Sequence, residues 1–173
     1  MRPLILIDVD GVLNRLGRKR GVDRPWFQAE GMCDGETYPL VLNAQHGPKL
    51  LQLAEDTGAE LVWATTWQEE ANTQIAPLVG LPTLPAIDVE RHRQLLGSDI
   101  PGVCRKTPYV AEYVGDRPFV WFDDDTTKWD QDYLSERCGG PFRLVYVDRW
   151  DGLTDLDFAD ATRWFASLAG GAR

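Results

Sequence analysis

The sequence predicts a Rossmann-like α/β fold, a doubly wound parallel sheet covered by helices on both faces. Short apolar strands alternate with helical segments along the chain, which is the pattern of such a sheet. The strands expected at 4–7 and 119–122 are apolar throughout, as strands buried on both faces are. With 173 residues, of which 43% are hydrophobic, the chain is expected to form one domain, residues 1–173.

Helices and strands are expected in alternation after the first strand. Proline near a helix start and glycine after its end mark the helix from Pro48 to the residue before Gly58. Thr154 and Asp157 resemble a capping box at the start of the last helix. The other expected elements are a strand at 60–64, a helix at 68–76 ending at Pro77, irregular chain over 77–105, a helix at 108–114, a strand at 119–122, a helix at 128–137, a strand at 142–147 and a final helix over 154–168.

The segment at 14–46 is expected to form a flap or minimal cap inserted after the first strand. It contains many glycines and charges and little helical periodicity. A segment of this length without clear elements is usually functional or locally structured. Its length permits a hairpin-like lid around Trp26, Phe27 and Tyr38, and it leaves no room for a large cap domain.

Two carboxylates, Asp8 and Asp10, follow the first strand directly. Side chains two apart on a strand share a face, so both can converge on one point past the strand end. Gly11 permits a sharp change of backbone direction after them. Because close carboxylates repel unless a cation lies between them or one is protonated, the pair indicates a Mg²⁺ site that leaves room for a phosphate.

Polar residues also stand at or near the ends of other expected elements. Ligands of open α/β sheets bind beyond the carboxyl ends of the strands, so residues placed there can meet. Together these residues predict a site for a metal ion and a phosphate group. They are Thr65 and Thr66 after the second strand, Lys106 before the helix at 108–114, and Asp123, Asp124 and Asp125 after the strand at 119–122.

The order and placement of these residues resemble the haloacid dehalogenase-like (HAD) superfamily of phosphotransferases over residues 4–125. Asp8-Val9-Asp10-Gly11-Val12 is similar to the first motif of that superfamily, Thr65 to the second, Lys106 to the third and Asp123-Asp124 to the fourth. Further details resemble a compact, minimal-cap bacterial branch, whose related domains also occur attached to RNA-repair proteins. These details are Trp-Ala-Thr-Thr-Trp, Trp-Phe-Asp-Asp-Asp and Gly152-Leu153-Thr154.

The resemblance implies a Mg²⁺-dependent phosphomonoester hydrolase that acts through an aspartyl-phosphate. Asp8 would be the nucleophile, and Asp10 would act as general acid and then general base. Thr65 would bind a phosphoryl oxygen, while Lys106 would stabilise charge on the transferring group. The expected Mg²⁺ ligands are Asp8, Asp10, Asp124 and Asp123, with Asp124 preferred within the second acidic run. Either Asp123 or Asp125 would be a further ligand or support the ligands, and the alternative for Asp125 is a carboxylate at a helix entry.

The candidate substrate-binding residues are Gly11, Asn14, Thr66 and Trp67. Thr66 is the alternative to Thr65, because one of two adjacent strand residues normally faces a site. Trp67 could line the pocket and stack on a base or ring, in which case Trp67→Ala would impair aromatic phosphate substrates more than aliphatic ones. Asn14 either contacts substrate or stabilises the turn, and the turn role is favoured.

Charge defines the class of partner. The formal net charge of −9 disfavours extended nucleic-acid binding, which depends on neutralising phosphates. It is compatible with a phosphorylated small molecule, a nucleotide or a nucleic-acid end, and no obligate protein partner is evident. A local basic cluster is either a solvated loop or a patch that attracts phosphorylated substrate. The cluster comprises Arg15, Arg18, Lys19, Arg20 and Arg24.

Other features predict a cytoplasmic protein without a membrane segment. No apolar run reaches membrane-spanning length, and no signal-peptide pattern is present. Three widely spaced cysteines, Cys33, Cys104 and Cys138, favour reduced thiols. His46 and His92 are isolated and are expected to be structural or on the surface. The alternative function is a catalytically silent binding or regulatory protein of the same fold, and a phosphotransferase such as a phosphomutase is disfavoured because no large cap excludes water.

Overall fold

A parallel four-stranded sheet is the centre of the computed structural model, which describes residues 1–17, 25–89 and 100–170. Every neighbouring pair of strands in the sheet is parallel, so the fold is α/β and Rossmann-like, as predicted. The strands lie in the order β4 (Glu60–Trp63), β1 (Leu4–Ile7), β5 (Phe119–Asp123) and β6 (Phe142–Tyr146).

The register of the sheet brings the polar strand ends together. Ile7, the last residue of β1, pairs with Trp63 on one side and with Phe122 on the other. The backbone amide of Asp8 then donates to the carbonyl of Phe122 at 3.1 Å. The residues that follow β1, β4 and β5 therefore leave the sheet at one edge, where a ligand site of this fold is expected.

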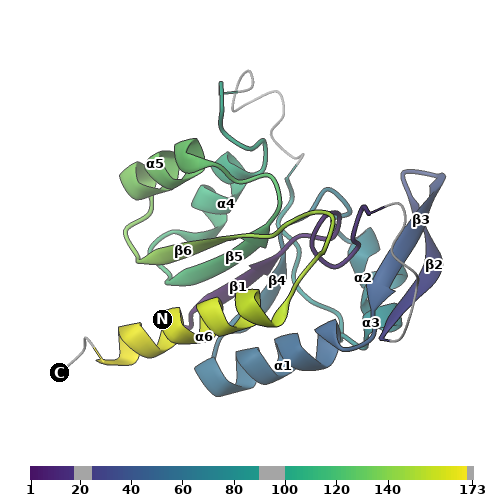
Figure 1. Ribbon diagram of the computed structural model, residues 1–173. Helices are drawn as coiled ribbons and strands as arrows, with labels where there is room; N and C mark the ends of the chain where they lie inside the picture. The colour runs from purple at the N-terminus through teal and green to yellow at the C-terminus, as the bar shows by residue number, and fades with distance from the viewer. Residues whose placement is uncertain (18–24, 90–99, 171–173) are drawn as a thin grey trace.

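Helices cover both faces of the sheet (Figure 1). On one face, α1 (His46–Thr57) and α6 (Asp155–Gly170) pack over the apolar side chains of Ile5 and Ile7. On the other, α4 (Thr107–Val114) and α5 (Lys128–Arg137) cover Leu4 and Leu6. Successive residues of β1 thus belong to different hydrophobic clusters, because side chains alternate along a strand. This two-faced burial explains why the strand is apolar throughout.

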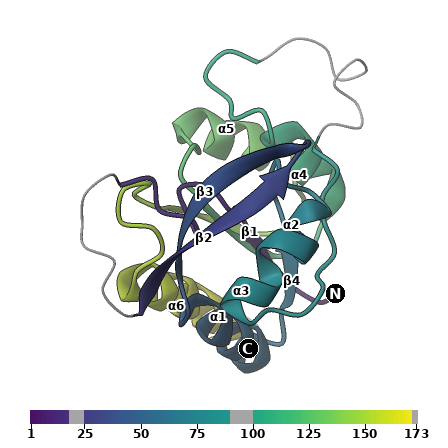
Figure 2. The same cartoon turned by 90° about the vertical axis from the view of Figure 1, so that its right-hand side faces the viewer.

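The insertion after β1 forms a β-hairpin in the part of it that the structure describes. Its strands are β2 (Trp26–Cys33) and β3 (Glu36–Asn43), and Asp34 and Gly35 join them with φ angles of 51° and 78°. Positive φ at both positions is typical of the two-residue turn whose twist matches a hairpin. The hairpin lies beyond the carboxyl ends of the sheet strands, and no large cap is present among the described residues (Figures 1 and 2).

The helix boundaries predicted around Pro77 are wrong. The structure has two short helices in this region, α2 (Glu70–Gln74) and α3 (Ala76–Val79), with Pro77 inside the first turn of α3. Proline is tolerated there because the N–H groups of a first turn have no partner within the helix. Most other observed ends differ from the expected ones by no more than two residues. Among the described residues, no helix combines the length and apolar character needed to span a membrane.

Candidate active site

Three buried carboxylates meet at the carboxyl edge of the sheet. Asp8 follows β1, Asp123 ends β5 and Asp124 comes directly after it. One oxygen from each lies within 4.8 Å of the others, and none of the three residues is more than 8% exposed. The donor set consists of carboxylate oxygens, the ligands that Mg²⁺ prefers in proteins.

Lys106 lies between two of these carboxylates. Its Nζ is 2.5 Å from Oδ2 of Asp8 and 2.5 Å from Oδ2 of Asp123. Burial by itself would lower the pKa of Lys106, but the charges of Asp8 and Asp123 outweigh it and raise that pKa above its ordinary value. The side chain is therefore a fixed, charged ammonium at the residue immediately before α4.

The site contains more negative than positive charge at its centre. Burial raises the pKa of Asp123 to about 7, with the Asp8 charge acting in the same direction and Lys106 opposing it. Burial and the Asp8 charge also raise the pKa of Asp124 above its ordinary value. A divalent cation would stabilise the ionised forms of these groups. Asp8, Asp123 and Asp124 thus fit a Mg²⁺ ion in both donor type and charge.

The carboxylate of Asp10 lies outside this acidic cluster. Its Oδ1 accepts a hydrogen bond from Nδ2 of Asn14 at 2.7 Å, and its Oδ2 accepts one from Nε1 of Trp67 at 2.8 Å. Asn14 in turn accepts from the backbone amide of Val41, on β3, at 2.9 Å. The Asp10 side chain is thereby oriented by residues behind it, and the prediction that it also binds the ion stays a prediction.

Gly11 occupies a position that no other residue fits. Its φ is +78°, and a Cβ built on it would overlap the carboxylate of Asp124. The glycine therefore allows the loop after β1 to approach Asp124 closely, in addition to permitting the change of backbone direction.

The two threonines after β4 differ in exposure. Thr65 is buried, and its Oγ1 accepts a hydrogen bond from the backbone amide of Trp67 at 3.4 Å. Thr66 is exposed and lines the cavity in front of the carboxylates. Position in the motif favours Thr65 and access favours Thr66, so the choice between the two hydroxyls stays open.

The Trp67 ring does not line the cavity in front of the carboxylates, so the structure gives no support to its stacking on a substrate ring. The residue is only 2% exposed. Its ring packs behind the site, in edge-to-face contact with Tyr38 at 5.9 Å, and a Cβ on Gly31 would press against it. The hairpin therefore covers the ring, and the indole N–H is the part directed toward the site. This direction depends on the folded hairpin, which the local sequence around Trp67 does not indicate.

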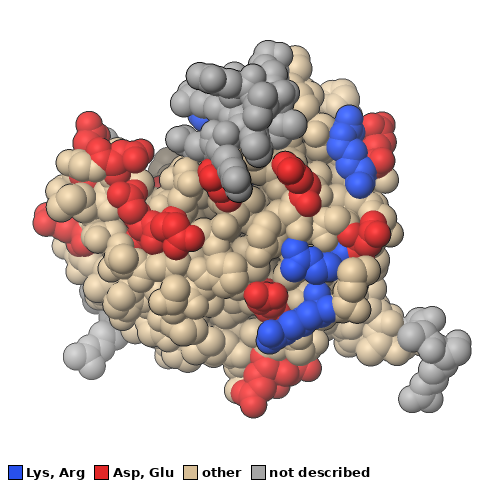
Figure 3. Space-filling view, turned by 180° about the vertical axis from the view of Figure 1, so that it is seen from behind, with Lys and Arg blue, Asp and Glu red and all other residues tan. Residues whose placement is uncertain are grey.

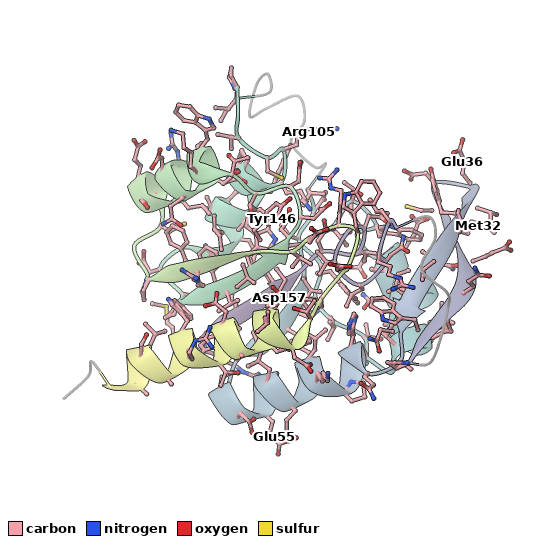
Figure 4. All side chains as sticks on the ribbon, viewed as in Figure 1. Met32, Glu36, Glu55, Arg105, Tyr146 and Asp157 are labelled. Atoms are coloured by element: carbon pink, nitrogen blue, oxygen red, sulfur yellow. The ribbon has the colours of Figure 1, made fainter. Side chains whose placement is uncertain are left out.

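A cavity of about 300 Å³ opens in front of these residues and is lined in part by Asp8, Asp10 and Lys106. Two arginines also line it. Arg105 lies on the loop before α4 (Figure 4), and Arg149 places its Nε 3.1 Å from Oδ2 of Asp124. Arg149 was missed by sequence reasoning, although it follows β6 at the edge of the sheet where the strand-end rule directs attention.

Cys104 lines the cavity, whereas the other residues considered in this paragraph lie away from the carboxylates or outside the described part. Arg15 is buried, with its guanidinium 4.3 Å from the centre of the Trp26 ring. His46 is buried as a structural residue and contacts the carbonyl of Leu153 at 3.1 Å. All three cysteines are free thiols. Arg18, Lys19, Arg20, Arg24 and His92 lie outside the described residues.

The face of the molecule drawn in Figure 3 gives little support for a long polyanionic partner. It shows acidic side chains in several separate patches, with basic ones close to acidic neighbours. In Figure 4, Met32 and Glu36 mark the far end of the hairpin, which carries a carboxylate rather than a basic group. Arg105, Arg149 and Lys106, which line the cavity, are therefore the basic groups best placed, among the described residues, to meet an anionic ligand.

Comparison with known proteins places the chain in one family. A family model described as "HAD domain in Swiss Army Knife RNA repair proteins" matches residues 4–158, which include every candidate site residue discussed above. No curated protein and no solved structure matches the chain significantly.

Proposed function

The chain belongs to the family of HAD domains in Swiss Army Knife RNA repair proteins, and from this premise we propose that it is a Mg²⁺-dependent phosphomonoester hydrolase acting through an aspartyl-phosphate. The family supports an activity of the phosphohydrolase type. The observation that carries the finer proposal is the Lys106 ammonium, held 2.5 Å from Asp8 beside two further buried carboxylates. Such an arrangement suits a carboxylate nucleophile that must approach an anionic phosphate.

In the first step, a carboxylate oxygen of Asp8 attacks phosphorus and the bond from phosphorus to the leaving oxygen breaks. Asp10, which lines the same cavity, donates a proton to that oxygen. Lys106 stabilises negative charge on Asp8 and on the transferring group. A bound Mg²⁺, held by Asp8, Asp123 and Asp124, would offset the repulsion between nucleophile and phosphate.

In the second step, water attacks the phosphorus of the aspartyl-phosphate. Asp10 accepts a proton from that water, and the bond between phosphorus and Asp8 breaks to release inorganic phosphate. The hydroxyl of Thr65 is proposed to bind a phosphoryl oxygen in both steps. Thr66 is the alternative, because it lines the cavity directly.

The proposed substrate is a phosphorylated small molecule, a nucleotide or a nucleic-acid end. A nucleic-acid end is supported by the family, whose description places its HAD domains in RNA-repair proteins. The two cavity arginines, Arg105 and Arg149, support an anionic substrate of either kind. The small hairpin supports access by a large substrate, because no large cap covers the site among the described residues.

The test is Mg²⁺-dependent release of phosphate by the parent protein and by Asp8→Asn. Substrates are an aryl phosphate, a mononucleotide and oligonucleotides phosphorylated at the 3′ or 5′ end. Activity that requires Mg²⁺ and disappears in Asp8→Asn is expected, and the ranking of substrates identifies the class. Absence of turnover with every substrate, in protein that still binds Mg²⁺, would instead favour a catalytically silent binding protein.

A further inference from the structure

We propose that Trp67 and Asn14 are positioning residues for proton transfer by Asp10. The inference rests on the proposed function, because it concerns how the general acid of that reaction is oriented. The indole N–H of Trp67 and the side-chain amide of Asn14 each donate to a different oxygen of Asp10, at 2.8 and 2.7 Å. Together they hold the plane of the carboxylate facing the cavity.

Asp10 is more exposed to solvent than the two residues that orient it. Asp10 is half-buried and lines the cavity, whereas Asn14 is 4% exposed and Trp67 is buried more completely. A ligand in the cavity can therefore meet Asp10 but not the indole ring. Trp67 acts on the reaction only through the carboxylate that it holds.

Contacts with the β-hairpin hold both of these hydrogen-bond donors in place. The Trp67 ring packs against the backbone of Gly31, where a Cβ would lie only 3.1 Å from it, and contacts the ring of Tyr38 edge to face. The carbonyl of the Asn14 side chain accepts the backbone amide of Val41. These contacts come from β2 and β3, so the hairpin supports the orientation of Asp10 as well as bordering the site.

Orientation matters because the terminal torsion of an aspartate is broad and does not select one carboxylate plane by itself. Each oxygen has two lone pairs. One donor on each oxygen fixes the plane and leaves a lone pair free on each, so the proton is held in that plane. General acid catalysis requires the proton within hydrogen-bond reach of the leaving oxygen, and misplaced groups lose much of the rate.

The dependence of rate on the leaving group separates this role from a merely structural one. Para-nitrophenyl phosphate and benzyl phosphate both present an aromatic ring, but the first leaving group departs without a proton and the second needs one. The parameter compared is kcat/KM, because it reports the steps up to the loss of the leaving group. Asp10→Asn gives the benchmark, a much larger loss with benzyl phosphate.

Trp67→Phe keeps an aromatic ring under the hairpin and removes the N–H group. We expect it to lower kcat/KM for benzyl phosphate by roughly ten- to a hundredfold, a part of the full general-acid contribution, and to change the value for para-nitrophenyl phosphate much less. Asn14→Ala should show the same ranking.

Trp63→Phe is the matched control. Trp63 is fully buried, and its Nε1 donates to Oδ1 of Asn72 at 2.8 Å, remote from Asp10 in the hydrogen-bond network. The Trp63→Phe variant loses the same kind of buried indole hydrogen bond, so it should change kcat/KM for the two substrates by equal factors. Thermal unfolding of each variant verifies folding, and Asn14→Ala carries the test if Trp67→Phe does not fold.

Equal losses with both substrates in Trp67→Phe and Asn14→Ala, while Asp10→Asn retains its ranking, would overturn the positioning role and leave the proposed function intact. A parent protein without any turnover that depends on Asp8 would overturn the proposed function, and the positioning role with it. The two failures are thus distinguishable in one set of assays.

Discussion

The Lys106 ammonium and the Asp8 carboxylate, 98 positions apart in sequence, are 2.5 Å apart in the structure. The contact joins the loop before α4 to the end of β1, and Asp123 contacts the same ammonium from β5. A buried cation between two buried carboxylates compensates charges that would otherwise be left unpaired. The same ion pair therefore contributes both to the stability of the folded site and to the proposed reaction.

Lys106→Met should impair both properties. Removal of the ammonium leaves Asp8 and Asp123 uncompensated, so the free energy of unfolding without Mg²⁺ should fall by about 3–5 kcal/mol. With saturating Mg²⁺, kcat should fall about 10²- to 10³-fold. Arg105→Met, at the exposed neighbouring position, should change stability by no more than about 0.5 kcal/mol. Urea unfolding and initial rates measure these effects, and an unchanged kcat in Lys106→Met would contradict the role given to the lysine.

Gly11→Ala should weaken Mg²⁺ binding. A Cβ at this position displaces the Asp124 carboxylate, and displaced ligand support typically lowers metal affinity about 10- to 100-fold. Gly35→Ala is matched, because its φ is also +78° and its Cβ would meet nothing within 4 Å. Both variants carry the strain of a left-handed residue, about 1–3 kcal/mol. Calorimetric titration with Mg²⁺ should distinguish them, and equal affinities would refute the steric argument.

Asp130→Ala should loosen the loop that carries Lys106. The fully buried Asp130 on α5 accepts hydrogen bonds from the amides of Cys104 and Thr127 and from the hydroxyl of Thr107, at 2.5 to 2.8 Å. Loss of these charge-assisted bonds should lower stability by about 3 kcal/mol or more and reduce kcat. Asp132→Ala, exposed on the same helix, is the control. Equally small changes in stability and kcat in both variants would mean that contacts other than those of Asp130 hold the loop in place.

His46 should make the protein sensitive to acid. Burial is the main reason why the pKa of His46 is lowered to about 4. The hydrogen bond to the Leu153 carbonyl and the charge of Asp155 raise this pKa, and the charge of Lys49 lowers it. The unfolded chain, with a pKa near 6.5, then binds a proton more readily than the folded chain. Stability should therefore fall as pH decreases from about 6.5 to about 4, by up to about 1.4 kcal/mol per unit.

His46→Gln provides the comparison for that prediction. Glutamine does not titrate, so the decrease in the free energy of unfolding over this pH interval should become smaller by an amount on the order of 3 kcal/mol. Urea unfolding of parent and variant at several pH values in the interval measures it. The same decrease in both proteins would assign the acid sensitivity to other groups.

Much of the fold and of the acidic cluster is predictable from sequence because it depends on local patterns. Apolar strands such as Leu4–Ile7 and Phe119–Asp123 are apparent from composition, and parallel pairing brings their ends to one edge. That geometry is sufficient to predict that Asp8, Asp123 and Asp124 lie close together. The hairpin is also predictable in outline, because the segment after β1 lacks helical periodicity and is too short for a large cap.

The remainder of the site depends on contacts between segments that no local pattern shows. The sequence does not indicate that the hairpin covers Trp67 and directs its N–H to Asp10. Asp130 resembles any acidic residue in a first helical turn, and its partners come from separate segments. Arg149 reaches Asp124 from the loop after β6. Each role requires the tertiary structure, since side-chain direction follows from packing rather than from sequence spacing.

Covalent phosphorylation of Asp8 tests the central claim most directly. Asp10→Asn should form the intermediate and hydrolyse it slowly, because water is no longer activated. After incubation with Mg²⁺ and para-nitrophenyl phosphate and an acid quench, mass spectrometry should find one phosphoryl group on the peptide that contains Asp8. The group should be absent when Asp8→Asn is combined with Asp10→Asn. Release of para-nitrophenol by Asp10→Asn while Asp8 stays unmodified would contradict the aspartyl-phosphate mechanism.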